Sequence, residues 1–369
     1  MSKIWQVAGL AMVLIAVACS DREVCHRTDS MTEYADYLSL IEEDSCVTAM
    51  LTNPWKPDRI LRSYVLTNDA ETEFSLQSEE NVVHTPLCRV VVTTNSHARL
   101  LSELGLTDFI AGVCEEEYIT DSLVRDRLDR GLIADCGNGM YPNIERIISL
   151  CPDAIFVSPF EEAGYGPLEM TGIPLIECAD YMETSPLGRA EWMRFYGRLF
   201  NAGDKADSLF GQICDKYNNI REETLTYNYR PSVMLDTKGS SAWYVAGGNS
   251  TIAKMIEDAG GKYLFSNNNK SGSVPLAFES VLERAADADI WLLKNSSARE
   301  LTYENLAGDF QAYTRFKPFT TRNIWVCDVY GTPYFEMTAF HPELLLEELQ
   351  QIFHQDTDDR STIFYKRMK

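Results

Sequence analysis

Two blocks of alternating strand and helix patterns constrain the fold of this chain most. In the first block, the apolar run "RVVVTT" is followed by the helix pattern "NSHARLLSELG" and then by the strand-like run "DFIAGVC". The second block starts with "PSVMLD" at Pro231 and continues through "WYVAGG", "FESVLERAADADIWLL" and "NIWVCD". Strands that alternate with helices favour parallel sheets with crossover connections.

A segment with helix patterns alone separates the two blocks. The stretch "PLGRAEWMRFYGRLF" is amphipathic, and a second helix pattern after "NAGD" reaches about Tyr227. We therefore predict an α/β protein with two similar lobes, mainly parallel sheets and a long helical connection. The expected boundaries are 37–186 for the N-terminal lobe, which opens with short strands, 187–228 for the bridging helices and 229–369 for the C-terminal lobe.

The N-terminus has the pattern of a targeting segment. Lys3 precedes an apolar run from Val7 to Val17, which is too short to span a bilayer but suits the core of a signal peptide. The run ends in "AVACS", so small residues directly precede Cys19, as in the lipidation motif of bacterial lipoproteins. We predict a signal peptide over 1–18 and a tether over 19–36 lipidated at Cys19. The alternative is an ordinary secretory signal with a chance cysteine.

Charge and cysteine spacing exclude several classes of function. The net charge of -22 repels phosphate backbones, so nucleic acid is not an expected partner. The five histidines are scattered and none of the ten cysteines forms a C-x-x-C pair, so we expect no zinc site and no resident cofactor. Cys25 with Cys46 is the one pairing that we consider for a disulfide.

The stretch "AGGNS" could be mistaken for a phosphate-binding loop. A glycine-rich turn before a helix can bind phosphate, but this one lacks both the Walker spacing and the G-x-G-x-x-G spacing. We expect instead that Gly247 and Gly248 form a tight turn and that Asn249 or Ser250 caps the following helix.

Four stretches of the chain together resemble a known family. "WYVAGGNSTIAKMIEDAGG", "RVVVTTNSHARLLSELGLTDFIAGV", "YPNIERIISLCPDAIFVS" and "YFEMTAFHPELLLEELQQIFH" occur in the order and spacing of the substrate-binding proteins of ABC importers for iron complexes and cobalamin. The resemblance covers roughly residues 37–369 and fits a lipoprotein branch of that family. It implies a rigid helix between the lobes, a ligand cleft between them and small lobe motions on binding.

The resemblance also implies which loops meet the ligand. In this family the ligand lies at the carboxyl ends of the strands, and aromatic walls with a few polar anchors suit a large macrocycle. For each aromatic residue the alternative is core packing, and for His97 it is a role at the start of a helix without metal coordination. The predicted ligand contacts are Asn95, Ser96, His97, Glu116, Tyr118, Met140, Tyr141 and Phe160 in the first lobe, and Trp243, Tyr244, Asn249, Lys294, Tyr330, Tyr334 and Phe335 in the second lobe.

Two glutamates match positions through which members of the family dock their permease. Glu145 in "NIERI" corresponds to the first-lobe position and Glu279 in "FESVL" to the second-lobe position. A carboxylate can pair with a permease arginine through two hydrogen bonds. The alternative is that both are solvated acids at the start of a helix, where the helix dipole favours them.

The residue types of the candidate loops narrow the ligand. The loops hold Glu115 to Glu117 and Glu161 to Glu162, with few basic residues besides Lys294, whereas anionic ferric complexes and haem need a basic cluster. We therefore favour an uncharged or cationic ligand that carries cobalt or iron: a corrinoid or a hydroxamate-type iron complex. The tryptophan that cobalamin binders place before the N-x-E helix is absent, since Met140 and Tyr141 stand there.

The sequence predicts a monomeric, lipid-anchored periplasmic protein that delivers its ligand to an ABC permease of the inner membrane. Asp21 and Glu23 soon after Cys19 leave display on the outer surface open, so a scavenger of haem or another ligand without a permease partner is the first alternative. A secreted hydrolase is the second alternative. The G-x-S-x-G motif is absent, and the adjacent acids from Glu115 to Glu117 favour a solvated loop.

Overall fold

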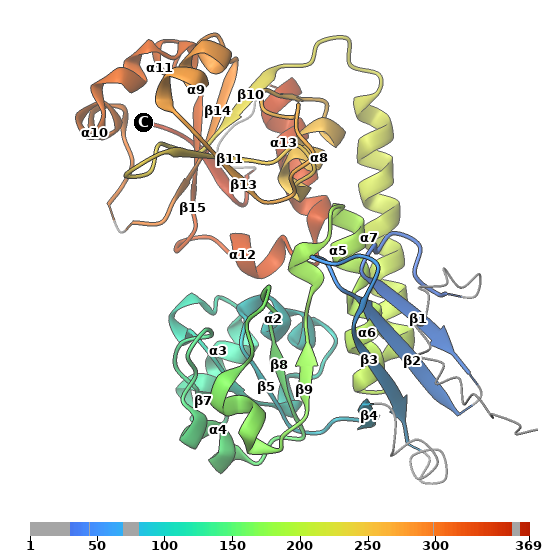
Figure 1. Ribbon diagram of the computed structural model, residues 1–369. Helices are drawn as coiled ribbons and strands as arrows, with labels where there is room; N and C mark the ends of the chain where they lie inside the picture. Colours follow the sequence, from blue (N-terminus) through green and yellow to red (C-terminus); the bar gives the residue numbers. More distant parts are fainter. Residues whose placement is uncertain (1–29, 44, 69–80, 298, 356–361) are drawn as a thin grey trace, which may run out of the picture.

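The computed structural model describes residues 30–43, 45–68, 81–297, 299–355 and 362–369. Two α/β lobes lie end to end, and one long helix, α7, runs beside both of them (Figure 1). The predicted signal peptide, Cys19 and Cys25 lie outside the described residues. Within the described ranges, no helix is both long enough and apolar enough to cross a membrane.

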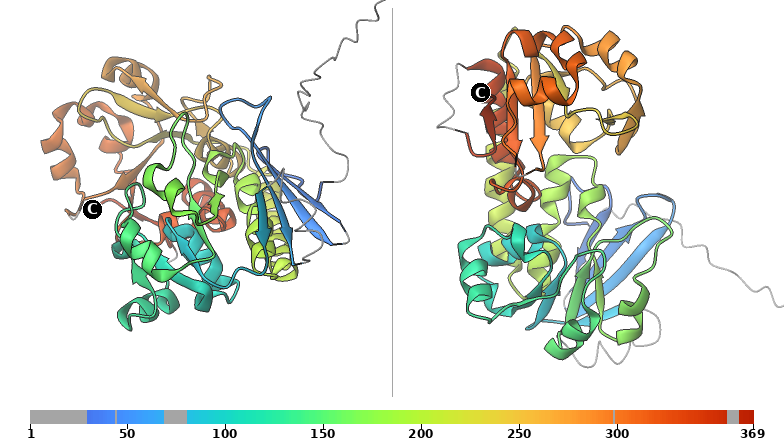
Figure 2. Two further views of the ribbon diagram at one scale, coloured as in Figure 1. Left: turned by 60° about the horizontal axis from the view of Figure 1, so that its bottom comes forward. Right: turned by 90° about the vertical axis from the view of Figure 1, so that its left-hand side faces the viewer.

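A four-stranded sheet precedes the parallel sheet of the first lobe. β1 (Leu38–Glu42), β2 (Cys46–Thr52) and β3 (Ile60–Thr67) are antiparallel, and β4 (Asn81–His84) pairs in parallel with β3. This arrangement confirms the short strands expected at the start of the first lobe. The apolar face of the sheet shares one core with the bridging helices. Figure 2 shows the sheet beside the first lobe from two further directions.

The first lobe contains a five-stranded parallel sheet in the order β7-β6-β5-β8-β9. Its central strand, β5, is buried at all three positions because helices cover both faces of the sheet. All carboxyl ends of these strands point to the second lobe. The elements are β5 (Val90–Val92), α2 (Asn95–Glu103), β6 (Ile110–Val113), α3 (Ser122–Asp129), β7 (Ala134–Asp135), α4 (Ile144–Leu150), β8 (Ala154–Val157) and β9 (Leu175–Glu177).

Three helices connect the lobes: α5 (Pro186–Glu191), α6 (Met193–Leu199) and the 22-residue α7 (Gly203–Thr224). A helix of this length spans about 33 Å. Phe210 and Ile213 of α7 lie in the core of the first lobe, whereas Tyr217 and Ile220 lie in the core of the second. Because one helix is packed into both cores, the connection is rigid.

The second lobe has a five-stranded sheet in the order β12-β10-β14-β15-β16, in which only β16 is antiparallel. The strands are β10 (Ser232–Leu235), β12 (Lys262–Tyr263), β14 (Ile290–Asn295), β15 (Ile324–Asp328) and β16 (Tyr365–Arg367). The helices are α8 (Thr251–Asp258), α9 (Phe278–Ala285), α10 (Tyr303–Asp309), α11 (Lys317–Thr320), α12 (Tyr334–Met337) and α13 (Pro342–His354).

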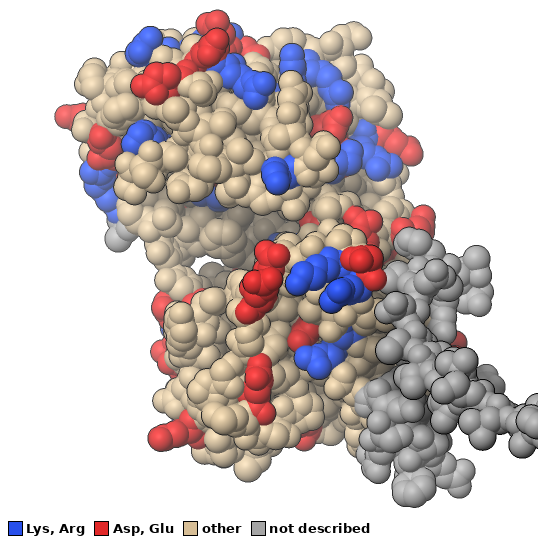
Figure 3. Space-filling model, in the orientation of Figure 1, with Lys and Arg blue, Asp and Glu red and all other residues tan. Residues whose placement is uncertain are grey.

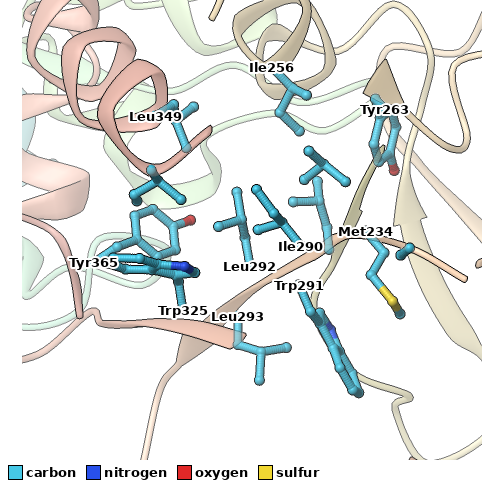
Figure 4. Packing of buried hydrophobic residues seen from close by; sticks show 14 of the residues in the cluster. Met234, Ile256, Tyr263, Ile290, Trp291, Leu292, Leu293, Trp325, Leu349 and Tyr365 are labelled. Atoms are coloured by element: carbon cyan, nitrogen blue, oxygen red, sulfur yellow. The ribbon is translucent and has the colours of Figure 1, made fainter. Parts of the chain in front are cut away.

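Side chains of β14 alternate between the two faces of this sheet. Ile290 and Leu292 point to the face covered by α8 and α13, where Ile256 and Leu349 lie, and Trp291 points to the other face (Figure 4). The run "WYVAGG" does not join this sheet, contrary to the predicted rhythm. It forms β11 (Trp243–Ala246), which pairs with β13 (Ser273–Leu276) in a separate antiparallel ribbon.

The two glycines after β11 are required by a close backbone approach. A Cβ atom on Gly247 would lie 2.0 Å from the Lys270 carbonyl oxygen, and one on Gly248 would lie 2.2 Å from the carbonyl oxygens of Ser266 and Asn268. The Ser250 hydroxyl accepts the Ala253 N–H and caps α8. The turn is therefore a packing feature, as predicted, and Ser250 is the cap.

Candidate functional site

The candidate site is the cleft where the two lobes face each other. Ligands of open α/β sheets bind at the carboxyl ends of the strands, and here those ends of both lobes border the cleft. Tyr118 of the first lobe lies against Tyr330 of the second, and both line a pocket of about 810 Å³ between the lobes. Figure 3 shows the surface hollowed between the upper and lower lobes.

The first-lobe wall of this larger pocket is small. It consists of Glu117 and Tyr118, which belong to a short 3-10 helix after β6. A hydrogen bond with Tyr330 raises the pKa of the Tyr118 hydroxyl above its ordinary value of 10. The second-lobe wall comes from the loops after β14 and β15 and from the end of the chain: Asn295, Ser296, Ser297, Arg299, Glu300, Leu301, Val326, Asp328, Tyr330, Gly331, Thr332, Phe364, Lys366, Arg367, Met368 and Lys369.

A second pocket of about 630 Å³ in the second lobe shares the loop after β14 with the larger pocket. Its walls include residues 237–240, which follow β10, and Lys294 at the end of β14. The Lys294 ammonium lies 3.0 Å from the Asp236 carboxylate. Burial lowers the pKa of Lys294, but Asp236 more than offsets this effect and the pKa is raised, so the pocket holds a permanent cation. Lys238 donates to the carbonyl oxygens of Gly239 and Ser240.

Three further contacts hold the lobes together behind the pockets. The Glu336 carboxylate of α12 accepts the backbone N–H groups of Thr120 and Asp121, at 3.2 Å in each case. His341, at the start of α13, contacts Glu103 of α2 at 2.6 Å. Burial lowers the pKa of His341, but the carboxylates of Glu103 and Glu343 raise it by more. The net pKa is about 9, so the imidazole is charged at neutral pH. These contacts fix the C-terminal segment on the first lobe.

Three of the predicted ligand contacts line the pockets. Tyr118 and Tyr330 belong to the larger pocket and Lys294 to the smaller one. Six other predicted residues have side chains that are accessible in part or in full but line neither pocket. They are Asn95, Glu116, Met140, Tyr141, Phe160 and Tyr244. Asn249 and Phe335 are likewise exposed and outside the two pockets.

Four predicted contacts have buried side chains that present no surface to the cleft: Ser96, His97, Trp243 and Tyr334. His97 contacts Thr94 and lies 3.1 Å from Asp180. Burial raises the pKa of Asp180, but His97 and Arg189 bring it down to about 2, so Asp180 is a buried carboxylate that both residues contact.

The two buried aromatic residues of the second lobe belong to its core. Trp243 stacks on Trp291 with ring centroids 6.0 Å apart and donates its indole N–H to the Leu235 carbonyl. Tyr334 packs edge-on against Phe364 and Tyr365. Trp243 and Tyr334 are therefore core residues, which was the alternative to ligand contact for each of them. Sequence periodicity gave no means to choose between the two faces of these short elements.

The sequence analysis missed the basic residues of the second-lobe pockets. We expected Lys294 almost alone, but the pocket walls also contain Lys238, Arg299, Lys366, Arg367 and Lys369. Two of them are paired with acids: Arg299 lies 2.6 Å from Asp309 and Lys369 lies 3.1 Å from Glu300. The argument that the cleft lacks basic residues is therefore wrong. The signal was the position of Lys238 and Arg299 in loops directly after β10 and β14.

Glu145 and Glu279 occupy equivalent places in the two lobes. Each lies in the first turn of a helix, Glu145 in α4 and Glu279 in α9, and both side chains are exposed. Exposure at a helix start agrees equally with docking and with simple solvation, because the helix dipole favours an acid there.

These features of fold and cleft match a known family. A sequence profile of the periplasmic binding proteins matches residues 90–323. The chain belongs to this family, and its architecture is that of the helix-bridged substrate-binding proteins.

Two relatives come from the archaeon Methanocaldococcus jannaschii and are both described as lipoproteins. One is 25% identical over 362 residues, which cover 90% of this chain and 84% of the relative. The other is 24% identical over 356 residues, which cover 91% of this chain and 87% of the relative.

Solved structures show the same fold at low sequence identity. A possible iron-binding periplasmic protein of Staphylococcus epidermidis has a TM-score of 0.59, is 17% identical and covers 73% of this chain and 100% of its own. IsdE of S. aureus, solved with heme, has a TM-score of 0.56 at 18% identity, with coverages of 72% and 99%. The vitamin B12 binding protein BtuF of Vibrio cholerae has a TM-score of 0.52 at 14% identity, with coverages of 72% and 96%.

Proposed function

We propose that this protein is the substrate-binding lipoprotein of an ABC importer, which captures a metal-bearing ligand and delivers it to a permease. The candidate ligands are a corrinoid, a ferric siderophore and haem. The observation that carries the proposal is the cleft itself: two rigidly bridged lobes present the carboxyl ends of their strands to each other around a pocket of about 810 Å³.

The chemistry of the cleft suits a large ligand with both apolar and polar groups. The stacked Tyr118 and Tyr330 offer flat apolar faces, and Lys294 offers a fixed cation. Solved structures of the same fold include binders described as iron, heme and vitamin B12 proteins. Because basic residues do line the pockets, anionic ferric complexes and haem belong among the candidates alongside the corrinoid and the ferric hydroxamate.

Isothermal titration of the detergent-solubilised full chain tests the proposal. The ligands are cyanocobalamin, a ferric hydroxamate, a ferric catecholate and haemin, with metal-free hydroxamate as the control. Saturable binding of one metal-bearing ligand at submicromolar concentration is the expected result. Absence of binding across the panel would overturn the proposal and leave only the fold and family.

The rigid bridge gives a second expectation for the same ligand. Because α7 is packed into both cores, the lobes should move little on binding. Small-angle X-ray scattering should give the same radius of gyration with and without ligand. A marked decrease on binding would show a wide hinge closure and contradict this mechanism.

We further propose that the chain is held to the cell envelope by lipid at Cys19. The small residues before Cys19 and the lipoprotein relatives support this proposal. Cys19→Ala should move the protein from the membrane fraction to the soluble fraction, whereas Cys25→Ala, as the matched control, should leave it with the membranes. Unchanged membrane association of Cys19→Ala would show that another segment anchors the protein.

A further inference from the structure

The connection between β2 and β3 lies at the rim of the cleft, although it precedes the part of the chain that the family profile matches. We call residues 53–59 the rim hairpin. Lys56 lies 3.7 Å from Glu162, which belongs to the loop after β8. That loop leaves the carboxyl end of β8 and also carries the exposed Phe160. The rim hairpin therefore stands beside a loop at the carboxyl end of the first-lobe sheet, the end that faces the second lobe.

Contacts at the base of the rim hairpin hold it in this position. Thr52 donates its N–H to the carbonyl oxygen of Tyr37. Tyr37 donates its own N–H to the carboxylate of Glu183, which lies shortly before α5. In Figure 1 the blue chain accordingly reaches the level of α5, where the lobes meet. On the other strand, Arg62 lies 2.9 Å from the buried Glu177 at the end of β9.

The rim hairpin is also rigid within itself. The Asn53 side chain accepts the N–H groups of Trp55 and Lys56, both at 2.9 Å, and the Asn53 N–H bonds to the Arg59 carbonyl at 2.8 Å. Two prolines, at 54 and 57, further restrict the backbone. A rigid turn loses little conformational entropy when a ligand binds to it.

The side chains of the rim hairpin include an aromatic ring, two cations and one acid, Asp58, so its net charge is positive. Trp55 is half-buried, whereas Lys56 and Arg59 are exposed. The contact between Lys56 and Glu162 joins two exposed groups, so it is weak and easily exchanged for a ligand group. An aromatic face next to cations suits a bulky chelate with acidic groups at its edge.

We propose that the rim hairpin is a third wall of the ligand cleft, in which Trp55 packs against the ligand and Lys56 and Arg59 pair with acidic groups at its edge. This inference rests on the proposed function. It assigns binding residues to the four-stranded sheet that precedes the parallel sheet of the first lobe. It also makes the protein selective for anionic members of a ligand class.

Paired probes that share one chelate and differ in the charge at its edge test this selectivity. The probes are haemin and its dimethyl ester, and ferrioxamine B and its N-succinyl derivative, titrated by calorimetry into the detergent-solubilised full chain. In the double variant Lys56→Glu, Arg59→Glu, the acidic member of the pair that binds should lose about tenfold or more in affinity, the effect of one charge-assisted contact. The affinity for the uncharged or cationic counterpart should change less than about twofold, because that probe has no acidic group to pair with Lys56 or Arg59.

Three further variants make the result specific. Trp55→Ala should weaken the binding of both members of the pair. Trp55→Phe should keep most of the affinity, because it retains an aromatic face. Arg130→Glu is the matched control: Arg130 is an exposed cation with an exposed acidic partner, Asp126, at the far end of α3. It should leave both affinities unchanged. Thermal melts of all variants verify that they fold.

The outcomes separate this inference from the proposed function. If the double variant loses affinity for the acidic probe alone, and Arg130→Glu changes neither affinity, the rim hairpin is supported as a wall of the cleft. Unchanged affinities in the double variant and in Trp55→Ala, or equal losses for both members of the pair in the double variant, overturn it while the proposed function stands. If no probe and no member of the wider panel binds the unmodified protein, both the proposed function and this inference are overturned.

Discussion

Tyr118 and Tyr330, which lie 212 positions apart in the sequence, stack across the cleft with their ring centroids 5.4 Å apart and their planes inclined by 25°. Each ring belongs to a loop at the carboxyl end of a strand, one in each lobe. The pair therefore joins the two lobes on the wall of the larger pocket.

Removing one ring should loosen the first-lobe loop. Tyr330→Ala deletes a stacking contact worth about 1 kcal/mol, so residues 115–120 should open more often. Hydrogen–deuterium exchange of these amides should become about fivefold faster, in line with that energy. Tyr330→Phe is the control, because it keeps the ring and removes the hydroxyl. Equal exchange rates in the unmodified protein and Tyr330→Ala would show that the stack does not hold the loop.

The buried His341 should make stability depend on pH above neutrality. Its pKa is raised from 6.5 to about 9, so its contribution is complete below pH 6.5 and is lost as the pH rises through 9. The shift corresponds to at most about 3 kcal/mol. His341→Gln should therefore flatten the decline in unfolding free energy between pH 6.5 and 9.5, measured by urea denaturation. His354→Gln, whose histidine has a lowered pKa, should keep the decline; the same slope in all three proteins would argue against a charged His341.

The turn after β11 should not tolerate a side chain. Gly248→Ala would place a Cβ atom 2.2 Å from two carbonyl oxygens, so the backbone must shift at a cost of about 3 kcal/mol or more. Gly211→Ala is the matched control on α7, where the added Cβ meets nothing within 4 Å. It should raise stability by up to about 1 kcal/mol, because alanine favours a helix over glycine. Thermal melts of the two variants should therefore shift in opposite directions.

Permease delivery should depend on the paired surface acids. If Glu145 and Glu279 dock the permease, Glu145→Arg with Glu279→Arg should abolish ligand uptake in cells, since the two carboxylates become charges of the same sign as the permease arginines. Binding by the purified protein should be unchanged. Glu283→Arg, one turn further along α9 and exposed, is the control and should keep uptake. Normal uptake by the double variant would favour a scavenger without a permease.

The alternation of strands and helices was sufficient to predict both parallel sheets and the bridge. The short run of β-branched residues from Val90 to Val92 favours a buried strand, and the helix-only segment contains no strand pattern. The ribbon of β11 and β13 was not predictable in this way. A four-residue strand has the same local pattern whether it joins the central sheet or pairs beside it, and tertiary contacts decide between the two.

The candidate site was predictable only at the level of loops. The loops after β6, β14 and β15 were expected at the cleft because of their places after strands. Which side chain of a loop faces the pocket depends on turns that no periodicity describes, so Tyr118 was found and Lys238 was missed. Burial of His97 depends on Asp180, 83 positions away, and such a partner has no local signature.

The sharing of α7 between the two cores has a consequence for dissection of the molecule. Phe210 and Ile213 complete one core and Tyr217 and Ile220 complete the other, so a cut anywhere along this helix would expose apolar surface on both halves. Neither lobe is a portable module, and chimaeras with related proteins should exchange loops around the cleft and keep the helix with both of its native neighbours.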